Sequence, residues 1–192
     1  EFTTVLPGSF ERYRKKVRGR KYPIIAPLPN NARKTLPIEN SHVRGPYLYL
    51  VCIKNGEIKY IGKAYDETVL MRWIRPVKSP YKYCWTHGTD SSIRVSTVEK
   101  IADEISNSNG PVRLYFANYS ILFTLVQNHC QDCSLDSSEI EAMSQEDFIE
   151  ELEHYMTYTL QPLWNIKNKN KPPTSSIKKC GDYWNTSTSS NN

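Results

Sequence analysis

Long apolar runs are missing from this sequence. No stretch is long enough to span a bilayer, which takes about 20 predominantly apolar residues. The first residues, EFTTVLPGSF, also lack the basic and then apolar order of a signal peptide. These two absences argue against a membrane protein, and we expect a cytoplasmic protein with no membrane partner.

Cysteine is scarce and odd in number, since the chain contains only Cys52, Cys84, Cys130, Cys133 and Cys180. Without a signal peptide, an odd count argues against a scaffold held together by disulfides. His129, Cys130 and Cys133 have the spacing of a zinc half-site, but no second cysteine pair supplies the remaining ligands of structural zinc. We therefore expect free thiols in a surface loop there.

Positive charge is missing from residues 131 to 166, which hold nine acidic residues and no Lys or Arg. Residues 1 to 44 have the opposite balance, with ten Lys or Arg against three Glu. Seven of these basic residues fall within ten positions and would release counterions from a nucleic-acid backbone: Arg12, Arg14, Lys15, Lys16, Arg18, Arg20 and Lys21. The alternative is a solvated basic tail. A basic arm beside an acidic region suits a protein that binds a polyanion and holds a cation elsewhere.

Two strand-like runs joined by Asn55-Gly56 predict a β-hairpin. Residues 47 to 53 are apolar, aromatic and β-branched, and a second strand begins at residue 59. Asn-Gly is the strongest short hairpin signal because both residues tolerate positive φ. A two-residue turn pairs Ile53 with Ile58, Val51 with Tyr60 and Tyr49 with Gly62, which places Tyr49 and Tyr60 on one face of the sheet. We expect Gly62 to leave open space beside Tyr49, where a ligand can approach.

The remaining pattern predicts an α/β fold in which a small three-stranded antiparallel sheet is flanked by helices. Helical periodicity covers residues 66 to 74, ended by Pro76, and residues 95 to 106, and residues 112 to 117 form the third strand. Residues 120 to 127 fit a strand or a helix, residues 128 to 143 fit an acidic loop, and a helix capped by Ser144 follows. We divide the chain into a basic, Pro-rich extended arm (1–44), a folded domain (45–166) and a polar, partly disordered tail (167–192).

Several of these residues resemble the GIY-YIG nuclease family. Tyr60-Ile61-Gly62 is the second half of the motif that names the family, and Tyr49 stands eleven residues before Tyr60, as the family's first tyrosine does. Tyr47-Leu48-Tyr49 replaces Gly-Ile-Tyr, so the choice between Tyr47 and Tyr49 stays open. The resemblance extends over roughly residues 47 to 165 and adds three further positions, which are the helix arginine Arg72, the helix glutamate Glu153 and the terminal asparagine Asn165.

The resemblance implies hydrolysis of a phosphodiester bond by water at a site formed by Tyr49, Tyr60, Lys63, Arg72, Glu153 and Asn165. A phenol has a pKa of about 10 in water, so it acts as a base only where positive charge lowers that value. Tyr49 is then the general base, Tyr60 orients the water or a phosphate oxygen, and Arg72 stabilises the growing charge. Glu153 holds Mg²⁺, or Mn²⁺ in its place, and Asn165 supports the fold beside the site. Where the family often has a histidine after its arginine this chain has Pro76, and His87 or Lys63 are the candidate substitutes.

The implied substrate is double-stranded DNA, which the arm and loops must recognise because the chain leaves no room for a separate DNA-binding domain. Arg75, Lys78 and Lys82 join the basic residues of the arm as expected DNA contacts. A compact nuclease of this kind favours a type II restriction-type endonuclease that cuts a short site as a homodimer, with residues 23–37 and 131–143 as candidate interface segments. The alternatives are a repair, phage or mobile-element nuclease of loose specificity, and a non-catalytic DNA-binding protein with this fold.

Overall fold

An antiparallel sheet forms the centre of the protein. The computed structural model of the chain describes residues 3–5, 10–17, 20–27, 43–68, 74–76, 83–85, 97–108, 110–132, 136–166, 168–173 and 177–178. Within them, the sheet has the order β1-β8-β4-β5, formed by β1 (Thr3–Val5), β8 (Val112–Asn118), β4 (Tyr47–Cys52) and β5 (Ile58–Ala64). Strands β8, β4 and β5 confirm the predicted three-stranded antiparallel sheet, and β1 extends it at one edge.

A second sheet, which the sequence did not predict, has the order β2-β3-β7-β6. It contains β2 (Phe10–Val17), β3 (Arg20–Pro27), β7 (Tyr83–Trp85) and β6 (Ile74–Pro76). The extended arm is therefore in part a hairpin, and the helix predicted over residues 66 to 74 is wrong at Ile74. Pro76 disfavours a helical conformation of Arg75, and pairing with β7 supplies the hydrogen bonds that a helix would have supplied.

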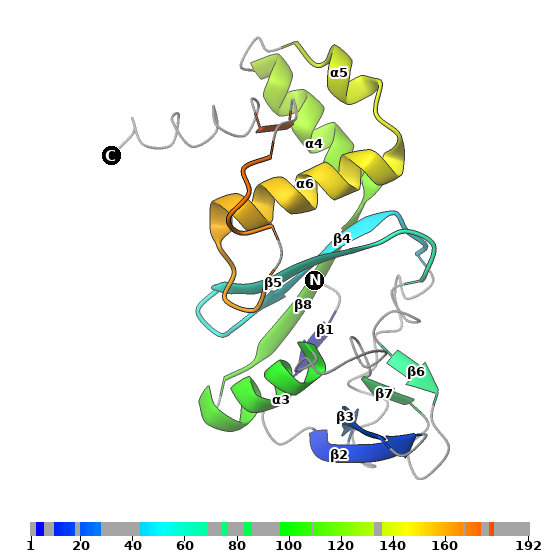
Figure 1. Cartoon of the computed structure of the whole chain (residues 1–192), viewed down its shortest axis with the longest axis vertical. Helices are drawn as coiled ribbons and strands as arrows, with labels where there is room; N and C mark the ends of the chain where they lie inside the picture. The colour runs from blue at the N-terminus through cyan, green and yellow to red at the C-terminus, as the bar shows by residue number, and fades with distance from the viewer. Residues whose placement is uncertain are drawn as a thin grey trace.

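Helices cover the central sheet on one side, as Figure 1 shows. Helix α6 (Gln145–Leu160) lies across β5 and β4, and α4 (Tyr119–Asp132) packs against α6 and the end of β8. The short helix α5 (Ser138–Glu141) connects them, whereas α3 (Thr97–Ser108) lies at the far end of β8, where it contacts β3. Helix α3 confirms the helix predicted near residues 95 to 106, and α4 resolves residues 120 to 127 as helix.

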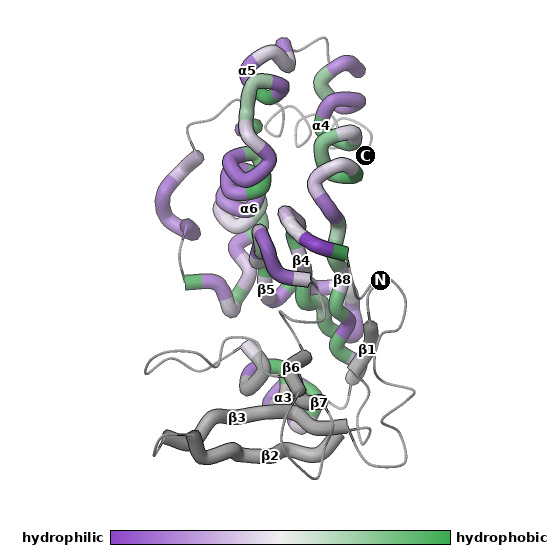
Figure 2. Tube along the Cα trace, turned by 90° about the vertical axis from the view of Figure 1, so that its right-hand side faces the viewer, coloured by the Kyte–Doolittle hydropathy of each residue, from purple (hydrophilic) through white to green (hydrophobic). Residues whose placement is uncertain are grey.

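The core between the sheet and the helices is aromatic and aliphatic. Leu48 from β4 meets Phe148, Ile149 and Leu152 from α6 in one buried cluster. The ring of Phe148 lies edge-on to Tyr119 and Phe123 of α4, with both centroid distances at 5.4 Å. Figure 2 shows the resulting pattern: β4 and β8 carry hydrophobic stretches, and the helices alternate hydrophobic and hydrophilic residues. This packing fixes the rotation of α6 about its axis, and hence which of its acidic residues face the sheet.

The N-terminus of α6 is capped as the sequence predicts. Ser144 Oγ accepts a hydrogen bond from the backbone N–H of Asp147 at 3.1 Å and donates one to the Asp147 carboxylate at 2.7 Å. Ser144 is the N-cap residue with extended backbone dihedrals, so the helix begins at Gln145. The cap therefore sets the start of the helix that carries Glu153.

The acidic loop predicted over residues 128 to 143 is wrong in two places. Residues 128 to 132 are the last turn of α4, and α5 occupies residues 138 to 141 with Ile140 fully buried. Cys130 is also fully buried and disulfide-bonded, so the expectation of a free surface thiol is wrong for this residue. Cys130 and Ile140 both belong to the core cluster around Phe148, and their burial anchors the end of α4 and α5 to the core.

The hairpin register is confirmed at the site and shifted at the turn. Val51 pairs with Tyr60 and Tyr49 with Gly62, as predicted. The turn itself holds three residues instead of two, because Ile53 hydrogen-bonds both Gly56 and Glu57, and Gly56 adopts a φ of 85°. Cys52 then pairs with Ile58, and a bulge between Val51 and Cys52 restores the register. The predicted pairing of Ile53 with Ile58 is therefore wrong by one residue.

The outer edge of β5 is covered by the segment after α6. The side chain of Asn165 pairs with the backbone of Ile61, accepting its N–H at 2.9 Å and donating to its carbonyl at 2.8 Å. One residue earlier, the N–H of Trp164 donates to the carbonyl of Lys59 at 2.8 Å. Asn165 is buried, with 8% of its surface exposed, so these bonds form away from water. Asn165 therefore supports β5 through its amide.

Replacing Asn165 with Ala is expected to destabilise the protein by about 2 kcal/mol, since the change leaves two backbone groups of Ile61 without a partner. Chemical denaturation monitored by circular dichroism measures this loss. Asn128→Ala, on the exposed surface of α4, is the matched control and should change stability by less than about 0.5 kcal/mol. Equal stability of the two variants would show that the amide bonds contribute nothing to the fold.

Candidate functional site

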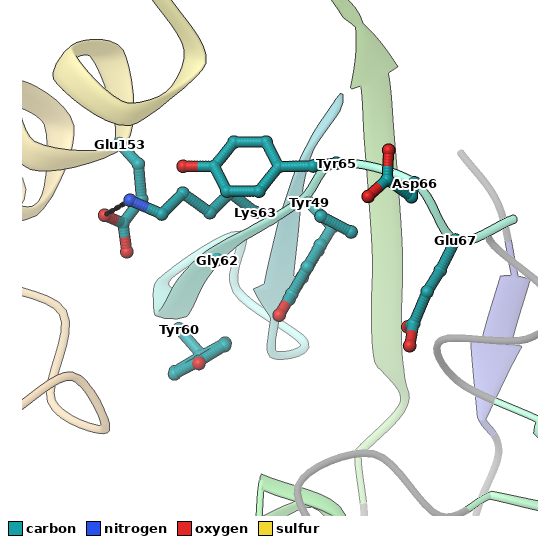
Figure 3. Close-up of a pocket in the computed structure, with 9 residues that line it drawn as sticks. Tyr49, Tyr60, Gly62, Lys63, Tyr65, Asp66, Glu67 and Glu153 are labelled. Atoms are coloured by element: carbon teal, nitrogen blue, oxygen red, sulfur yellow. Dashed lines mark ion pairs between the residues drawn. The ribbon is translucent and has the colours of Figure 1, made fainter. Parts of the chain in front are cut away.

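A pocket of about 520 Å³ opens where β5 ends beside α6. Its lining comes from β4, β5, the turn after β5 and α6, and comprises Tyr49, Tyr60, Gly62, Lys63, Ala64, Tyr65, Asp66, Glu67 and Glu153. Figure 3 shows Glu153 at one end of this group, Asp66 and Glu67 at the other, and the two tyrosines Tyr49 and Tyr60 between them. The pocket thus combines phenols, carboxylates and one ammonium group.

The tyrosines take their places from the hairpin register. Tyr49 stands opposite Gly62, and Tyr60 is its diagonal neighbour, with the two ring centroids 6.0 Å apart. A Cβ at Gly62 would collide with the ring and hydroxyl of Tyr49. The open space predicted beside Gly62 is therefore wrong, because the Tyr49 phenol itself fills it. Gly62 is needed for the close approach of that ring.

Tyr47, the alternative first tyrosine, has a different place. Both tyrosines are buried, Tyr47 at 0% and Tyr49 at 1% exposure, but Tyr47 packs edge-on against Phe116, with the ring centroids 6.0 Å apart. Of the two described tyrosines, Tyr49 lines the pocket and Tyr47 does not. The geometry therefore favours Tyr49 as the residue that faces a ligand.

The pocket reaches both faces of β5. Side chains alternate along a strand, so Tyr60 and Gly62 share the face of Tyr49, whereas Lys63 projects to the face that α6 covers. Figure 3 shows Lys63 on the same side of β5 as Glu153, with Tyr49 and Tyr60 on the other side. A ligand that touched the phenols and the carboxylate at once would have to lie across the end of this edge strand.

Glu153 is the carboxylate of α6 that lines the pocket. Its side chain is 13% exposed, and burial raises its pKa, although the ammonium of Lys63 acts in the opposite direction. Asn168 donates a hydrogen bond to Oε2 at 3.4 Å, and Lys63 Nζ lies 3.5 Å from the same oxygen. Glu153 is thus partly buried and already faces a cation in the pocket. One protein carboxylate of this kind can hold Mg²⁺ when substrate phosphate oxygens supply further ligands.

Among the residues that the structure describes, no group of three or more His, Cys, Asp or Glu side chains is arranged to hold a metal. Glu153 could hold Mg²⁺ or Mn²⁺ only where water and substrate oxygens complete the shell. Asp66 and Glu67 are the remaining carboxylates of the pocket, at its far end (Figure 3).

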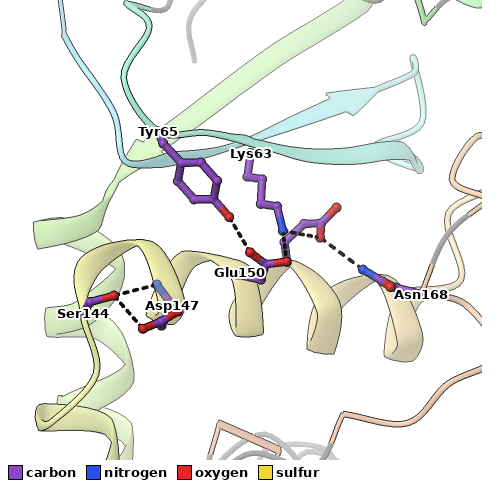
Figure 4. Close-up of polar contacts among 7 residues, drawn as sticks. Lys63, Tyr65, Ser144, Asp147, Glu150 and Asn168 are labelled. Atoms are coloured by element: carbon purple, nitrogen blue, oxygen red, sulfur yellow. Dashed lines mark hydrogen bonds and ion pairs between the residues drawn. The ribbon is translucent and has the colours of Figure 1, made fainter.

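Lys63 links the pocket to two successive turns of α6. Its ammonium lies 3.0 Å from Glu150 Oε1 and 3.5 Å from Glu153 Oε2, and Tyr65 Oη donates to Glu150 Oε2 at 2.7 Å (Figure 4). Burial by itself lowers the pKa of Lys63, but the hydrogen bond to Glu150 and the charge of Glu153 outweigh it and raise the pKa. The hydrogen bonds from Tyr65 and Lys63 lower the pKa of Glu150. Lys63 is thus held in its charged form.

Glu150 and Tyr65 were missed as site residues, although the sequence contained signals for both. Tyr65 stands two residues after Lys63, the spacing that returns to the same face of a strand. Glu150 precedes Glu153 by three residues and so lies beside it on the helix surface. Asn168, the third contact of this cluster, follows the helix in an irregular segment and had no such signal.

The basic residues predicted to contact DNA gather in the second sheet. Arg12, Arg14, Lys15 and Lys16 are in β2, Arg20 and Lys21 are in β3, and Arg75 is in β6. The hairpin pairs Lys16 with Lys21, so positive charge is concentrated toward its turn. Arg18, Arg72, Lys78, Lys82 and His87 lie outside the described residues, as does residue 133 of the candidate zinc half-site.

Comparison of the chain with protein-family models, with curated proteins and with solved structures found no match. In the part of the chain that the structure describes, none of the helices combines the length and apolar character needed to cross a bilayer.

Proposed function

We propose that this protein is a divalent-metal-dependent DNA endonuclease that hydrolyses phosphodiester bonds in the pocket at the end of β5, beside α6. The observation that carries this proposal is that Tyr49, Tyr60, Lys63 and Glu153, four of the residues singled out by the resemblance to GIY-YIG nucleases or beside its motif, line the same pocket. They come from two strands and a distant helix, so their meeting depends on the fold. A phenol pair, an ammonium and a partly buried carboxylate suit phosphate better than an apolar ligand.

Each residue has a defined role in this proposal. Tyr49 accepts the proton of the attacking water, and Tyr60, whose ring lies beside it, orients that water or a phosphate oxygen. Arg72 supplies the positive charge that a phenol needs to act as a base. The ammonium of Lys63, on the other face of β5, supplies positive charge for a phosphate oxygen in the transition state. Glu153 would hold Mg²⁺ or Mn²⁺, which polarises a phosphate oxygen and offsets its developing charge when bound.

The substrate we propose is double-stranded DNA, cut at a short site by a type II restriction-type enzyme. The chain has a formal net charge of +5, and the β2–β3 hairpin concentrates the basic residues that a phosphate backbone requires. Cutting two DNA strands that are related by a two-fold axis requires two active sites, so we include a homodimer in this proposal. A cytoplasmic location belongs to it as well, and the disulfide at Cys130 is the feature that weighs against it, because disulfides persist in oxidising compartments.

Incubation of supercoiled plasmid with the protein, with Mg²⁺ and then with EDTA, tests the function. Discrete linear fragments that appear with Mg²⁺ and vanish with EDTA are the expected result. A smear of fragments would indicate a repair, phage or mobile-element nuclease of loose specificity instead of a restriction-type enzyme. Retained DNA binding with no cleavage in Mg²⁺ or Mn²⁺ would leave a DNA-binding protein without catalysis and would contradict the proposal.

The basic hairpin is expected to supply affinity without taking part in the chemistry. Substituting Arg14, Lys15 and Lys16 together by Gln should flatten the dependence of DNA affinity on salt by up to about three units of slope, since each phosphate contact contributes about 0.9. Substitution is preferable to deletion because the neighbouring β1 pairs with β8 in the central sheet. Fluorescence anisotropy with a labelled duplex at several salt concentrations measures the slope. The exposed Lys54→Gln is the control, and an equal slope in both variants would show that the hairpin does not contact DNA.

A further inference from the structure

Two carboxylates on successive turns of α6 share one ammonium group. Glu150 and Glu153 are three residues apart, and Lys63 reaches between them from β5, 3.0 Å from one and 3.5 Å from the other (Figure 4). The cluster therefore carries one more negative charge than positive charge. A cluster with this excess repels a phosphate and attracts a second cation.

The two carboxylates are not equivalent. Glu150 is the more exposed, at 61% of its side chain, and it also accepts the hydroxyl of Tyr65. Glu153 is 13% exposed, lines the pocket and has the longer contact with Lys63. The ammonium is thus held mainly by the outer carboxylate and extends over the inner one.

We propose that Lys63 is an exchangeable counter-ion of Glu153: its ammonium occupies the place beside the carboxylate that a divalent cation takes, and Glu150 retains the lysine in the pocket once the cation has entered. This inference rests on the proposed function, because it concerns the cation that the nuclease reaction requires. A divalent cation and an ammonium close to one carboxylate oxygen repel each other, so one must withdraw. Glu150 offers the ammonium a second anchor within the same cluster.

The exchange reverses the sign of the charge on the cluster formed by Lys63, Glu150 and Glu153. With the divalent cation bound and Lys63 retained, the cluster has one more positive charge than negative charge, and it then attracts a phosphate. Entry of the metal is thereby coupled to binding of the substrate, with Lys63 as a phosphate contact and Glu150 as a positioning residue that acts through it.

Titration of the full-length protein with Mn²⁺, with free Mn²⁺ followed by electron paramagnetic resonance, tests the exchange without any cleavage. Lys63→Met should bind Mn²⁺ about tenfold more tightly, since the competing ammonium is gone. Glu150→Gln should bind it about tenfold more weakly, because Lys63 then pairs with Glu153 alone. Lys63→Arg, which keeps the charge, should stay close to the unmodified protein. Glu153→Gln should lose the site.

Two controls separate exchange from a general change in charge. Lys59→Met removes a partly buried ammonium from the same strand, and Glu146→Gln removes a carboxylate one turn before Glu150; both should leave Mn²⁺ affinity unchanged. Circular dichroism of each variant establishes that it is folded. An unmodified protein that bound no Mn²⁺ would overturn the proposed function and this inference together. Binding that depends on Glu153 but is not tightened by Lys63→Met, or is weakened as much by Glu146→Gln as by Glu150→Gln, would overturn the inference alone.

Discussion

Replacement of Glu153 by Gln is expected to abolish metal-dependent cleavage and, at neutral pH, to make the protein more stable. The loss of cleavage follows because Glu153 is the carboxylate proposed to hold the metal, and an amide oxygen carries no charge to bind it. DNA binding through the basic β2–β3 hairpin should persist, since those proposed phosphate contacts do not depend on the metal, whereas the metal-coupled contact through Lys63 should be lost. The gain in stability follows from burial, which raises the pKa of Glu153 and so disfavours its ionised form in the folded protein.

The pH dependence of this gain has a definite sign. A raised pKa in the folded state means that the native protein keeps the Glu153 proton to a higher pH than the unfolded chain does. The stability from the neutral form is complete below the unfolded value of about 4.3 and is lost as pH rises through the folded value. The amide never ionises, so the variant should melt close to the unmodified protein near pH 4 and higher at pH 7. A typical effect of about 1 kcal/mol corresponds to a shift of about 2–4 °C in a chain of this size.

Glu150→Gln supplies the matched comparison, because the sign is opposite. Hydrogen bonds from Tyr65 and Lys63 lower the pKa of Glu150, so its contribution to stability is present at neutral pH and lost in acid. This variant should melt lower than the unmodified protein at pH 7, by a small amount because the side chain is exposed. Differential scanning fluorimetry between pH 4 and pH 7 measures both variants. Normal DNA cleavage by the Glu153→Gln protein would show that Glu153 does not hold the metal required for the reaction.

Tyr49→Phe is expected to slow cleavage by at least about 100-fold, the lower range for loss of a general base. Stability should barely change, because the ring that packs over Gly62 and beside Tyr60 is retained and only the hydroxyl is removed. Cleavage rates under single-turnover conditions, measured at saturating protein, separate this loss from any change in DNA binding.

Tyr47→Phe is the control for this experiment. Tyr47 lies two residues away on the same strand, packs against Phe116 and does not line the pocket, so removal of its hydroxyl should leave cleavage within a few fold of normal. Active Tyr49→Phe protein beside inactive Tyr47→Phe protein would transfer the role of base to Tyr47. Normal cleavage by both variants would exclude both Tyr47 and Tyr49 as the base.

The part of the site on the hairpin could be predicted from local chemistry alone. Asn55-Gly56 fixes where the chain turns, and the two-residue period of strands then brings Tyr49 opposite Gly62. Glu153 could likewise be selected from three neighbouring acids by its phase relative to Phe148 and Leu152. In both cases a regular period links sequence position to direction in space.

Other features depend on contacts between distant segments, which periodicity does not encode. Strand β2 is rich in charged residues and its partner β3 contains two prolines, and strand formation depends more on neighbouring strands than on composition. The run from Ile121 to Val126 fits both a strand and a helix, and Asn118, which accepts the N–H of Ile121 at 3.1 Å, was the overlooked start signal of the helix. The pairing of Lys63 with Glu150 needed the packing of α6 on the sheet, which the sequence does not specify.

The amide of Asn165 and the backbone of Trp164 also bear on how this protein avoids aggregation. Strand β5 is at the edge of its sheet, where free N–H and carbonyl groups would otherwise invite a strand from another molecule. The Asn165 side chain bonds the N–H and the carbonyl of Ile61, and the N–H of Trp164 bonds the carbonyl of Lys59. These groups are then not available to a strand of another molecule. A chain truncated before Pro162 would uncover that edge beside the pocket and should self-associate through β5 as its concentration rises.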